Sequence, residues 1–303
     1  MFRNDKIILP KIIGLSFLLL LCLSLQSVSF AQSSDDKSVA RVMTFNIRYN
    51  EPKDNENAWA NRKTKVAGVI RFHHADLVGV QEALLEQLKD LETLLPDYAW
   101  CGVGRSDGKS GGEFSAILYR KSRFKLLETS TFWLSETPEK AGSLGWDANY
   151  PRVVTWARFQ DKQTNRKFFH FNTHFDHRGE NARLESSKLL LAEIEKIAKD
   201  SLFVVTGDFN AKESTEIYKI LVGMSGNKTT KLKLKDARYA SINEPFGPTS
   251  TFNAFGPLIP DNKIDYIFVK EGMKVLEHGI LADQWDGRWA SDHLPVLAEV
   301  VVR

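Results

Sequence analysis

Short apolar runs typical of β-strands alternate along this chain with longer segments whose apolar positions recur every three or four residues. The runs predict strands at 42–45, 77–80, 114–119, 153–159, 168–172, 202–205, 264–269 and 296–301. The helical spacing predicts helices at 58–72, at 83–95 (which Pro96 ends) and around 190–197. Hairpins mixed with strand–helix steps predict two packed β-sheets with helices outside, a layered α/β sandwich.

The first 31 residues have a different pattern. Arg3, Lys6 and Lys11 precede an apolar run at 12–25, and Ser29-Phe30-Ala31 is a small-x-small cleavage motif. This order predicts a signal peptide at 1–31 and a secreted or periplasmic protein, with an N-terminal membrane anchor as the alternative. We expect a flexible lead-in at 32–40 and a single domain at 41–303, in which no apolar run approaches membrane-spanning length.

Composition excludes several classes of protein. With 303 residues, 43% of them hydrophobic and 26% charged, the chain is neither disordered nor collagen-like. After loss of the signal peptide only Cys101 remains of the two cysteines, so an internal disulfide is excluded. The signal peptide also carries a net +2 of the formal +3, which argues against a strongly basic nucleic-acid-binding protein.

A glycine-rich stretch at 102–112 contains Gly108-Lys109-Ser110, which resembles part of a phosphate-binding loop. That motif needs a glycine five positions before Gly108, where this chain has Val103. The segment that follows is also typical of a strand rather than a helix. The stretch is therefore predicted to be a hairpin loop.

Polar side chains stand at the ends of most predicted strands. The carboxyl ends of strands can converge on one edge of a sheet, and carboxylates, amides and imidazoles suit a divalent cation and an activated water. Each residue taken singly also has an ordinary explanation as a cap, a turn former or a structural histidine. The residues are Asn46, Glu82, His174, Asp208, Asn210, Asp265, Asp292 and His293.

Taken together and in this order, these residues resemble the endonuclease/exonuclease/phosphatase superfamily of metal-dependent phosphoesterases. The matching motifs are Thr44-Phe45-Asn46, Gln81-Glu82, Thr173-His174, Gly207-Asp208-Phe209-Asn210, Ile264-Asp265-Tyr266 and Ser291-Asp292-His293. Stretches at 132–138, 145–147 and 155–158 look closest to exported bacterial members related to the nocturnin-like and deadenylase-like branch. The resemblance implies a four-layered α/β sandwich, in which two packed mixed β-sheets are flanked by helices.

The resemblance also implies a role for each residue. Glu82, helped by Asn46 and Asp292, would hold Mg²⁺ or Mn²⁺. Asp208 would orient or deprotonate the attacking water, and Asn210 would position the water or the phosphate. His174 would donate to a phosphate oxygen, and His293 would act on the scissile phosphate with Asp265 fixing its tautomer. The number of metal ions and the identity of the general base stay open.

Four further residues are expected to bind substrate: Arg48, Arg152, His177 and Arg183. Guanidinium groups pair well with phosphate, although surface ion pairing is the alternative for each arginine. His177 lies close to His174 in the sequence, so it is expected to line the same pocket or to lie on a surface loop.

These observations predict a divalent-metal-dependent phosphoester hydrolase. The favoured substrate is a small phosphorylated metabolite, sugar, inositol phosphate or lipid head group. An exported nuclease acting on DNA or RNA is the alternative, which a charge near +1 does not favour. A non-catalytic binding module is a weaker alternative, because all eight site positions are filled. The choice between monoester and diester and the oligomeric state stay open.

Overall fold

The computed structural model describes residues 1–2, 38–226 and 231–303. The chain divides into Met1–Gln32 and a compact unit, Ser33–Arg303, whose architecture follows. Apart from its first two residues, the predicted signal peptide lies outside the described residues. Within the described part of the chain, no helix combines the length and the apolar character needed to cross a membrane.

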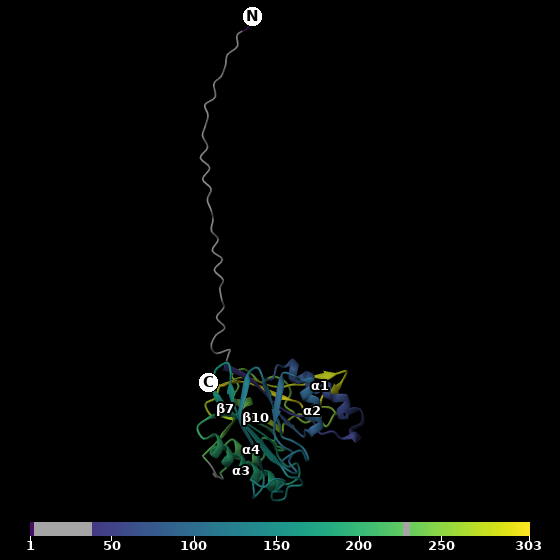
Figure 1. Cartoon of the computed structure of the whole chain (residues 1–303), viewed down its shortest axis with the longest axis vertical. Coiled ribbons are helices and arrows are strands. Elements are labelled where there is room, and N and C mark those ends of the chain that lie inside the picture. The colour runs from purple at the N-terminus through teal and green to yellow at the C-terminus, as the bar shows by residue number, and fades with distance from the viewer. Residues whose placement is uncertain (3–37, 227–230) are drawn as a thin grey trace. The chain divides into compact units, whose positions relative to one another are not determined.

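Two six-stranded sheets form the centre of the compact unit (Figure 1). The first has the order β11 (Val275–Ile280), β14 (Val296–Val301), β1 (Val39–Asn46), β2 (Leu77–Gln81), β4 (Ile117–Arg120) and β3 (Tyr98–Cys101). The second has the order β5 (Phe124–Trp133), β6 (Val153–Asp161), β7 (Lys167–His174), β8 (Leu202–Asp208), β10 (Asp265–Lys270) and β9 (Leu234–Asp236). Both sheets are mixed, since β1–β2 and β7–β8 are parallel pairs among antiparallel ones.

Helices cover the outer face of each sheet. Val66 and Ile70 of α1 (Trp59–Phe72) and Leu88 of α2 (Leu85–Leu94) share a buried cluster with the first sheet. Leu190 of α3 (Glu180–Ala198) and Ile217 of α4 (Glu216–Leu221) do the same for the second sheet. The predicted four-layered sandwich is thus confirmed. The smaller elements are η2 (Pro52–Asn57), α5 (Ala237–Ala240), β12 (Gln284–Trp285) and β13 (Arg288–Trp289).

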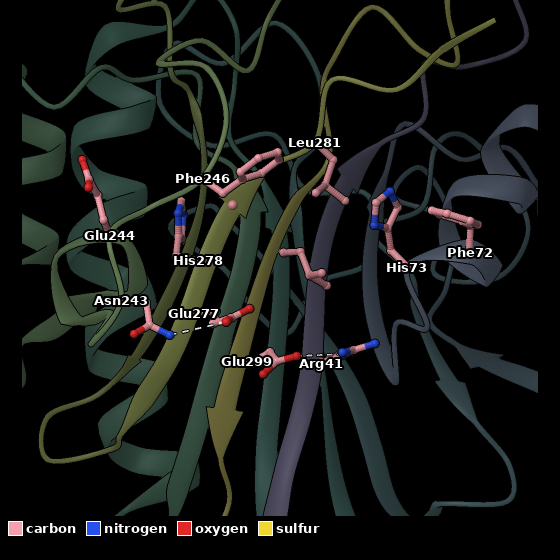
Figure 2. A pocket seen from close by; sticks show the side chains of 12 residues that line it. Arg41, Phe72, His73, Asn243, Glu244, Phe246, Glu277, His278, Leu281 and Glu299 are labelled. Atoms are coloured by element: carbon pink, nitrogen blue, oxygen red, sulfur yellow. Dashed lines mark hydrogen bonds and ion pairs between the residues drawn. The ribbon is translucent and has the colours of Figure 1, made fainter. Parts of the chain in front are cut away.

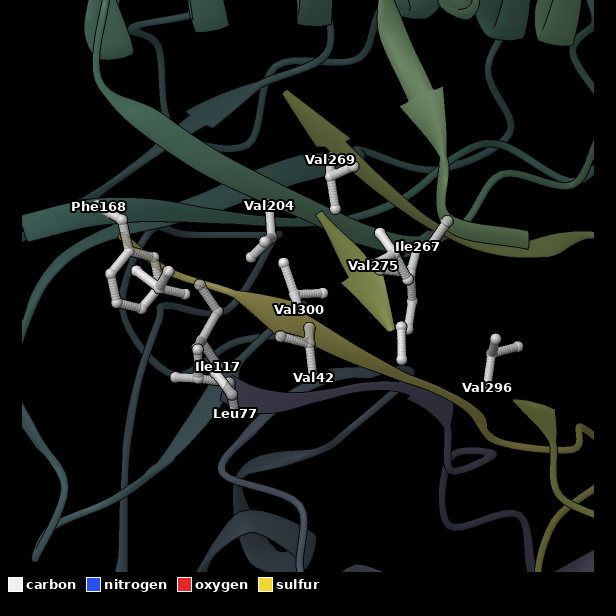
Figure 3. Packing of buried hydrophobic residues seen from close by; sticks show 14 of the residues in the cluster. Val42, Leu77, Ile117, Phe168, Val204, Ile267, Val269, Val275, Val296 and Val300 are labelled. Carbon is white, nitrogen blue, oxygen red and sulfur yellow. The ribbon is translucent and has the colours of Figure 1, made fainter. Parts of the chain in front are cut away.

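Between the sheets lies an apolar core made by both of them (Figure 3). Val42 and Leu77 of the first sheet are buried in the same cluster as Phe168, Val204 and Ile267 of the second. Burying each such side chain contributes about 1.5–3 kcal/mol relative to leaving it exposed. This core holds the two sheets face to face.

A buried hydrogen-bond network also joins the sheets, close to the strand ends. Gln81 Nε2 of β2 donates to Asn172 Oδ1 of β7 at 2.7 Å, and Thr206 Oγ1 of β8 donates to the same oxygen at 2.9 Å. Nε2 of His170 lies 2.8 Å from Thr206 Oγ1. The sheets approach so closely here that a Cβ on Gly79 would lie 2.1 Å from Thr206 Oγ1. Only glycine fits at this point of β2.

Some element bounds differ from those predicted. β1 begins at Val39 and pairs with β14 from its first residue, so residues 39–40 are strand and not flexible lead-in. Ala40 is fully buried. The sequence pattern did not predict this, because the residues before it are mostly polar. β5 was not predicted, because an edge strand with an exposed run at 127–130 lacks an apolar pattern. The glycine-rich stretch does connect two antiparallel strands, β3 and β4.

Candidate active site

The predicted site residues meet where the two parallel strand pairs end. Parallel strands bring their carboxyl ends to the same edge of a sheet, and the two sheets pack with these edges together. In the second sheet Asp208 lies between His174 and Asp265 in register. The loop before β14 joins them, because Ser291 Oγ donates to the Asn46 carbonyl at 2.7 Å. Both sheets therefore contribute reactive groups.

These groups surround a cavity of about 530 Å³. Asn46 and Asp265 do not line it but contact residues that do. Arg183 lies outside it, and its Nη1 donates to the Asp176 carbonyl. The lining residues are Arg48, Tyr49, Glu82, Arg105, Glu113, Tyr150, Arg152, His174, His177, Asp208, Asn210, Phe252, Ile264, Asp292 and His293.

Asp208 is the central carboxylate of the cavity. Its Oδ2 lies 3.5 Å from His174 Nε2, lies 3.7 Å from His293 Nε2 and accepts from Asn46 Nδ2 at 3.0 Å. Burial, together with the negative charge of Asp265, raises the pKa of Asp208 to about 7. A carboxylate with this pKa is suited to accept a proton near neutral pH.

His293 is held as a cation by its neighbours. Its Nδ1 lies 2.9 Å from Asp265 Oδ2. Burial alone would lower the pKa of this imidazole, but the carboxylates of Asp265 and Asp208 outweigh burial and raise the pKa well above its ordinary value. The charged ring therefore points its Nε2–H toward Asp208 and the cavity.

His174 has the opposite electrostatic environment. Burial and then the positive charges of Arg152 and Arg105 lower its pKa well below the ordinary value, so the ring is neutral. Its Nε2 lies 3.1 Å from Asn210 Nδ2, and its Nδ1 is buried without a hydrogen-bond partner, 4.0 Å from Glu113 Oε2. The site thus holds one neutral and one charged histidine on either side of Asp208.

Glu82 and Asp292 form the acidic end of the cavity. Burial raises the pKa of the Asp292 carboxyl, and the charge of Glu82 adds to this effect. The Arg48 guanidinium lies 3.8 Å from Glu82 Oε2 and 3.9 Å from Asp292 Oδ2. Two mutually repelling carboxylates fit a hard divalent cation.

Asn46 can join Glu82 and Asp292 as a metal ligand only after its side-chain amide rotates. Its Nδ2 donates to Glu82 Oε1 at 3.0 Å, while its Oδ1 accepts from the Arg48 backbone N–H. The amide must turn before its oxygen can face a cation. A second group of the described residues is also close enough to hold an ion, namely Asp208, Asp265 and His293.

Three residues that line the cavity have left-handed backbone conformations. The φ angles are 56° at Arg48, 61° at Glu82 and 47° at Asn210. Such a conformation costs a non-glycine residue about 1–3 kcal/mol. The hydrogen bonds of the site offset this cost, for example that of the Tyr49 backbone N–H to Glu82 Oε2 at 3.2 Å.

Several lining residues were not predicted from the sequence, among them Arg105, Glu113 and Tyr150. Arg105 and Glu113 lie on the loop between β3 and β4. The glycines of this loop predict a turn, and they do not indicate that these two side chains reach the site. Tyr150 lies near the end of the long loop between β5 and β6, two residues before Arg152, which was predicted. Nothing in the local pattern distinguishes these side chains from ordinary loop residues.

A second hollow, of about 410 Å³, lies over β1, β11 and β14 (Figure 2). Phe72 and Phe246 are largely exposed beside it, and His73 Nε2 lies 2.9 Å from Asp283 Oδ2. Two further pairs line it, Arg41 with Glu299 and Asn243 with Glu277. Its lining includes none of the predicted site residues, so the chemistry belongs to the first cavity.

Comparison with known proteins agrees with this assignment. Residues 43–293 match the Endonuclease/Exonuclease/phosphatase family. A protein of that family from Bacteroides vulgatus is 40% identical, with a TM-score of 0.82 over 88% of this chain and 99% of its own. A mannosyl-6-phosphatase from Bacteroides thetaiotaomicron is 36% identical, with a TM-score of 0.80 over 86% of this chain and 99% of its own.

A weaker relationship links the chain to nocturnin. Mouse nocturnin is 25% identical over 224 residues, which are 66% of this chain and 50% of the mouse protein. The chain thus spans about half the length of that relative. The predicted relationship to the nocturnin-like branch is confirmed.

Proposed function

Since the chain belongs to the endonuclease/exonuclease/phosphatase family, whose members hydrolyse phosphoester bonds, we propose that it is a divalent-metal-dependent hydrolase of a small phosphorylated metabolite. The observation that carries the proposal is the position of Asp208. It lies between a neutral and a charged histidine, at the edge where both sheets supply reactive groups.

The dimensions of the cavity favour a small substrate. A volume of about 530 Å³ accommodates a phosphorylated monosaccharide, an inositol phosphate or a lipid head group. The mannosyl-6-phosphatase relative makes a phosphorylated sugar the first of these to test. A nuclease would need a basic track that continues along a polymer, whereas the arginines here, Arg48, Arg105 and Arg152, all line one small cavity.

Each residue of the site has its own role in the proposed reaction. Asp208 accepts a proton from water as the water oxygen bonds to phosphorus and the bond to the leaving oxygen breaks. The charged His293 and the N–H of neutral His174 stabilise the charge on the phosphate oxygens. The leaving oxygen takes a proton from solvent. With His293 already protonated, Asp208 is the general base.

Glu82 and Asp292 would hold Mg²⁺ or Mn²⁺, with Asn46 after its amide turns. When bound, the cation supplies positive charge for the leaving oxygen. Arg48 contributes positive charge at the same end of the cavity.

A substrate panel tests the proposed activity. The purified protein is assayed with Mg²⁺, with Mn²⁺ and with EDTA on hexose phosphates, inositol phosphates, phospholipids and oligonucleotides. Metal-dependent hydrolysis of a small phosphoester supports the proposal. Cleavage of oligonucleotides alone would establish the nuclease instead, and absence of all hydrolysis would contradict both.

We also propose that the protein is exported, as the pattern of residues 1–31 predicts. The test is expression of the full chain in a Gram-negative bacterium, followed by fractionation and N-terminal sequencing. A mature chain that starts at Gln32 in the periplasm or medium supports export. A full-length chain in the membrane fraction would indicate an anchor.

A further inference from the structure

Two buried arginines stand at the end of the cavity beside His174. Arg105 is 8% exposed and Arg152 is 4% exposed, and both line the cavity. Arg105 comes from the loop between β3 and β4, and Arg152 directly precedes β6. They therefore converge on His174 from two different segments of the chain.

Arg105 is fixed in place from several sides. Its Nη1 donates to Glu113 Oε2 at 2.7 Å, and its guanidinium lies 4.9 Å from the centre of the Tyr150 ring. Trp133 Nε1 donates to its carbonyl at 2.7 Å, which ties the loop to β5. Because Glu113 Oε2 is also 4.0 Å from His174 Nδ1, Arg105 lies next to the phosphate-facing histidine.

Arg152 is held as firmly but has an unused nitrogen. Its Nε lies 3.4 Å from Asp176 Oδ2, and its Nη2 donates to His177 Nδ1 at 3.0 Å. Asp176 is itself anchored by the backbone N–H groups of Arg178 and Gly179. The remaining Arg152 Nη1 is buried without a hydrogen-bond partner, an arrangement that costs free energy unless a ligand completes it.

Little space lies behind these groups. A void of about 10 Å³, which is the size of one water molecule, is lined by Glu82, Arg105, Glu113, Phe114, Ser115, Arg152, Val153 and His174. A phosphate oxygen or a water fits in this void, whereas the carbon group that a second ester oxygen carries does not. The leaving group must therefore extend into the larger cavity of about 530 Å³, which Arg105, Arg152 and His174 also line.

We propose that Arg105 and Arg152 form a recognition site for a terminal phosphate, so that the protein hydrolyses phosphomonoesters and rejects phosphodiesters. The inference rests on the proposed hydrolase activity and names its substrate class. A monoester presents one more anionic oxygen than a diester, and two preorganised guanidinium groups favour that added charge.

The test uses two substrates with the same leaving group, 4-nitrophenyl phosphate and methyl 4-nitrophenyl phosphate. With Mg²⁺ or Mn²⁺, the unaltered protein is expected to have a kcat/KM for the monoester about a hundredfold or more above that for the diester. Arg105→Gln and Arg152→Gln should lower the monoester value about tenfold or more and change the diester value less than about threefold.

Matched controls keep the result interpretable. Arg166→Gln removes an exposed arginine in the turn between β6 and β7 and should change neither value. Arg105→Lys retains the charge and should recover part of the lost monoester activity. Thermal unfolding of each variant reports whether it folds. If Arg152→Gln does not fold, Arg105→Gln alone provides the test.

The outcomes separate this inference from the proposed function. A preference for the diester, or equal losses on both substrates, would overturn the terminal-phosphate site while leaving a hydrolase. If neither substrate is hydrolysed, titration calorimetry with inorganic phosphate still tests the site. Binding that Arg105→Gln weakens and Arg166→Gln does not would support the site, and binding unchanged in both would refute it.

Discussion

Nδ1 of His293 and Oδ2 of Asp265 lie 2.9 Å apart, both fully enclosed at the meeting edge of the two sheets. The pair fixes which nitrogen of the imidazole faces the cavity and keeps the ring charged. Asp265 does not line the cavity but acts on residues that do, because it pairs with His293 and its charge helps to raise the pKa of Asp208. It is therefore a positioning residue.

Replacing Asp265 by Asn should separate the effect of the orientation of the His293 ring from the effect of its charge. Asp265→Asn can retain a hydrogen bond to His293 but removes the negative charge, so the pKa of His293 should fall. We expect kcat to drop about ten- to a hundredfold. A pH–rate profile checks the cause, because the limb that reports His293 should move to lower pH. A uniform loss of rate at every pH would contradict the assigned role.

Asp208→Asn should have a larger effect. The amide cannot accept the proton of the attacking water, so kcat should fall about 10²–10⁴-fold while the far-ultraviolet circular dichroism is unchanged. His293→Ala should lower kcat in the same range. Asp97→Asn alters an exposed carboxylate and serves as the control. Unchanged turnover in Asp208→Asn would refute the site assignment.

Glu82→Gln should weaken metal binding. Loss of one carboxylate from the acidic end should raise the Kd for Mn²⁺ about tenfold or more, as measured by electron paramagnetic resonance. Glu86→Gln, an exposed change on α2, should leave the Kd as it is. If Asp265→Asn weakens Mn²⁺ binding and Glu82→Gln does not, the ion belongs to the Asp208, Asp265 and His293 group instead.

Two buried neutral histidines should make the fold sensitive to acid. Burial lowers the pKa of both His170 and His278 to about 3, whereas the unfolded chain binds these protons near the ordinary value of 6.5. Stability is therefore complete above about pH 6.5 and is lost as pH falls toward 3. Each histidine contributes a slope of up to about 1.4 kcal/mol per pH unit.

Urea unfolding at several pH values measures this slope. His170→Asn removes one titrating group and should flatten the dependence between pH 6 and pH 4, even if it lowers stability at pH 7. An unchanged slope would show that His170 is not the source.

Gly79→Ala tests the close approach of the two sheets. The added Cβ would meet Thr206 Oγ1 and the Asn172 side chain, so the free energy of unfolding should fall by about 1–3 kcal/mol. Gly226→Ala adds the same methyl group at a position where no atom of the described residues lies within 4 Å, and it should be nearly neutral. Equal effects of the two changes would mean that the network tolerates a wider separation of the sheets.

The residues that perform the chemistry could be predicted from the sequence because most of them stand at the ends of apolar strands. Asn46, Glu82, His174 and Asp208 take their positions from strand ends, and strand ends are visible as changes of pattern. The layered fold follows from the same alternation. The fold prediction uses local patterns, whereas the site prediction also uses the order of these residues along the chain, which resembles that of the superfamily.

The wall of the cavity could not be predicted in this way. Arg105 and Tyr150 reach the site through long loops whose paths depend on contacts with distant segments, such as that of Trp133 with the Arg105 carbonyl. Arg183 was predicted to bind substrate, but it lies on α3 outside the cavity, and its guanidinium donates to the Asp176 carbonyl. Loop and helix orientations are set by tertiary packing, which a strand-end pattern does not contain.

The hydrogen bond from Gln81 to Asn172 crosses between the sheets, and Thr206 donates to the same Asn172 oxygen from within the second sheet, only a few residues before the reactive side chains. Neither sheet alone holds a complete set of those groups. A partly folded chain with one sheet formed, or with both formed but apart, is therefore inert. During refolding the recovery of turnover should lag behind the recovery of secondary structure, which makes catalysis itself a reporter of the last docking event.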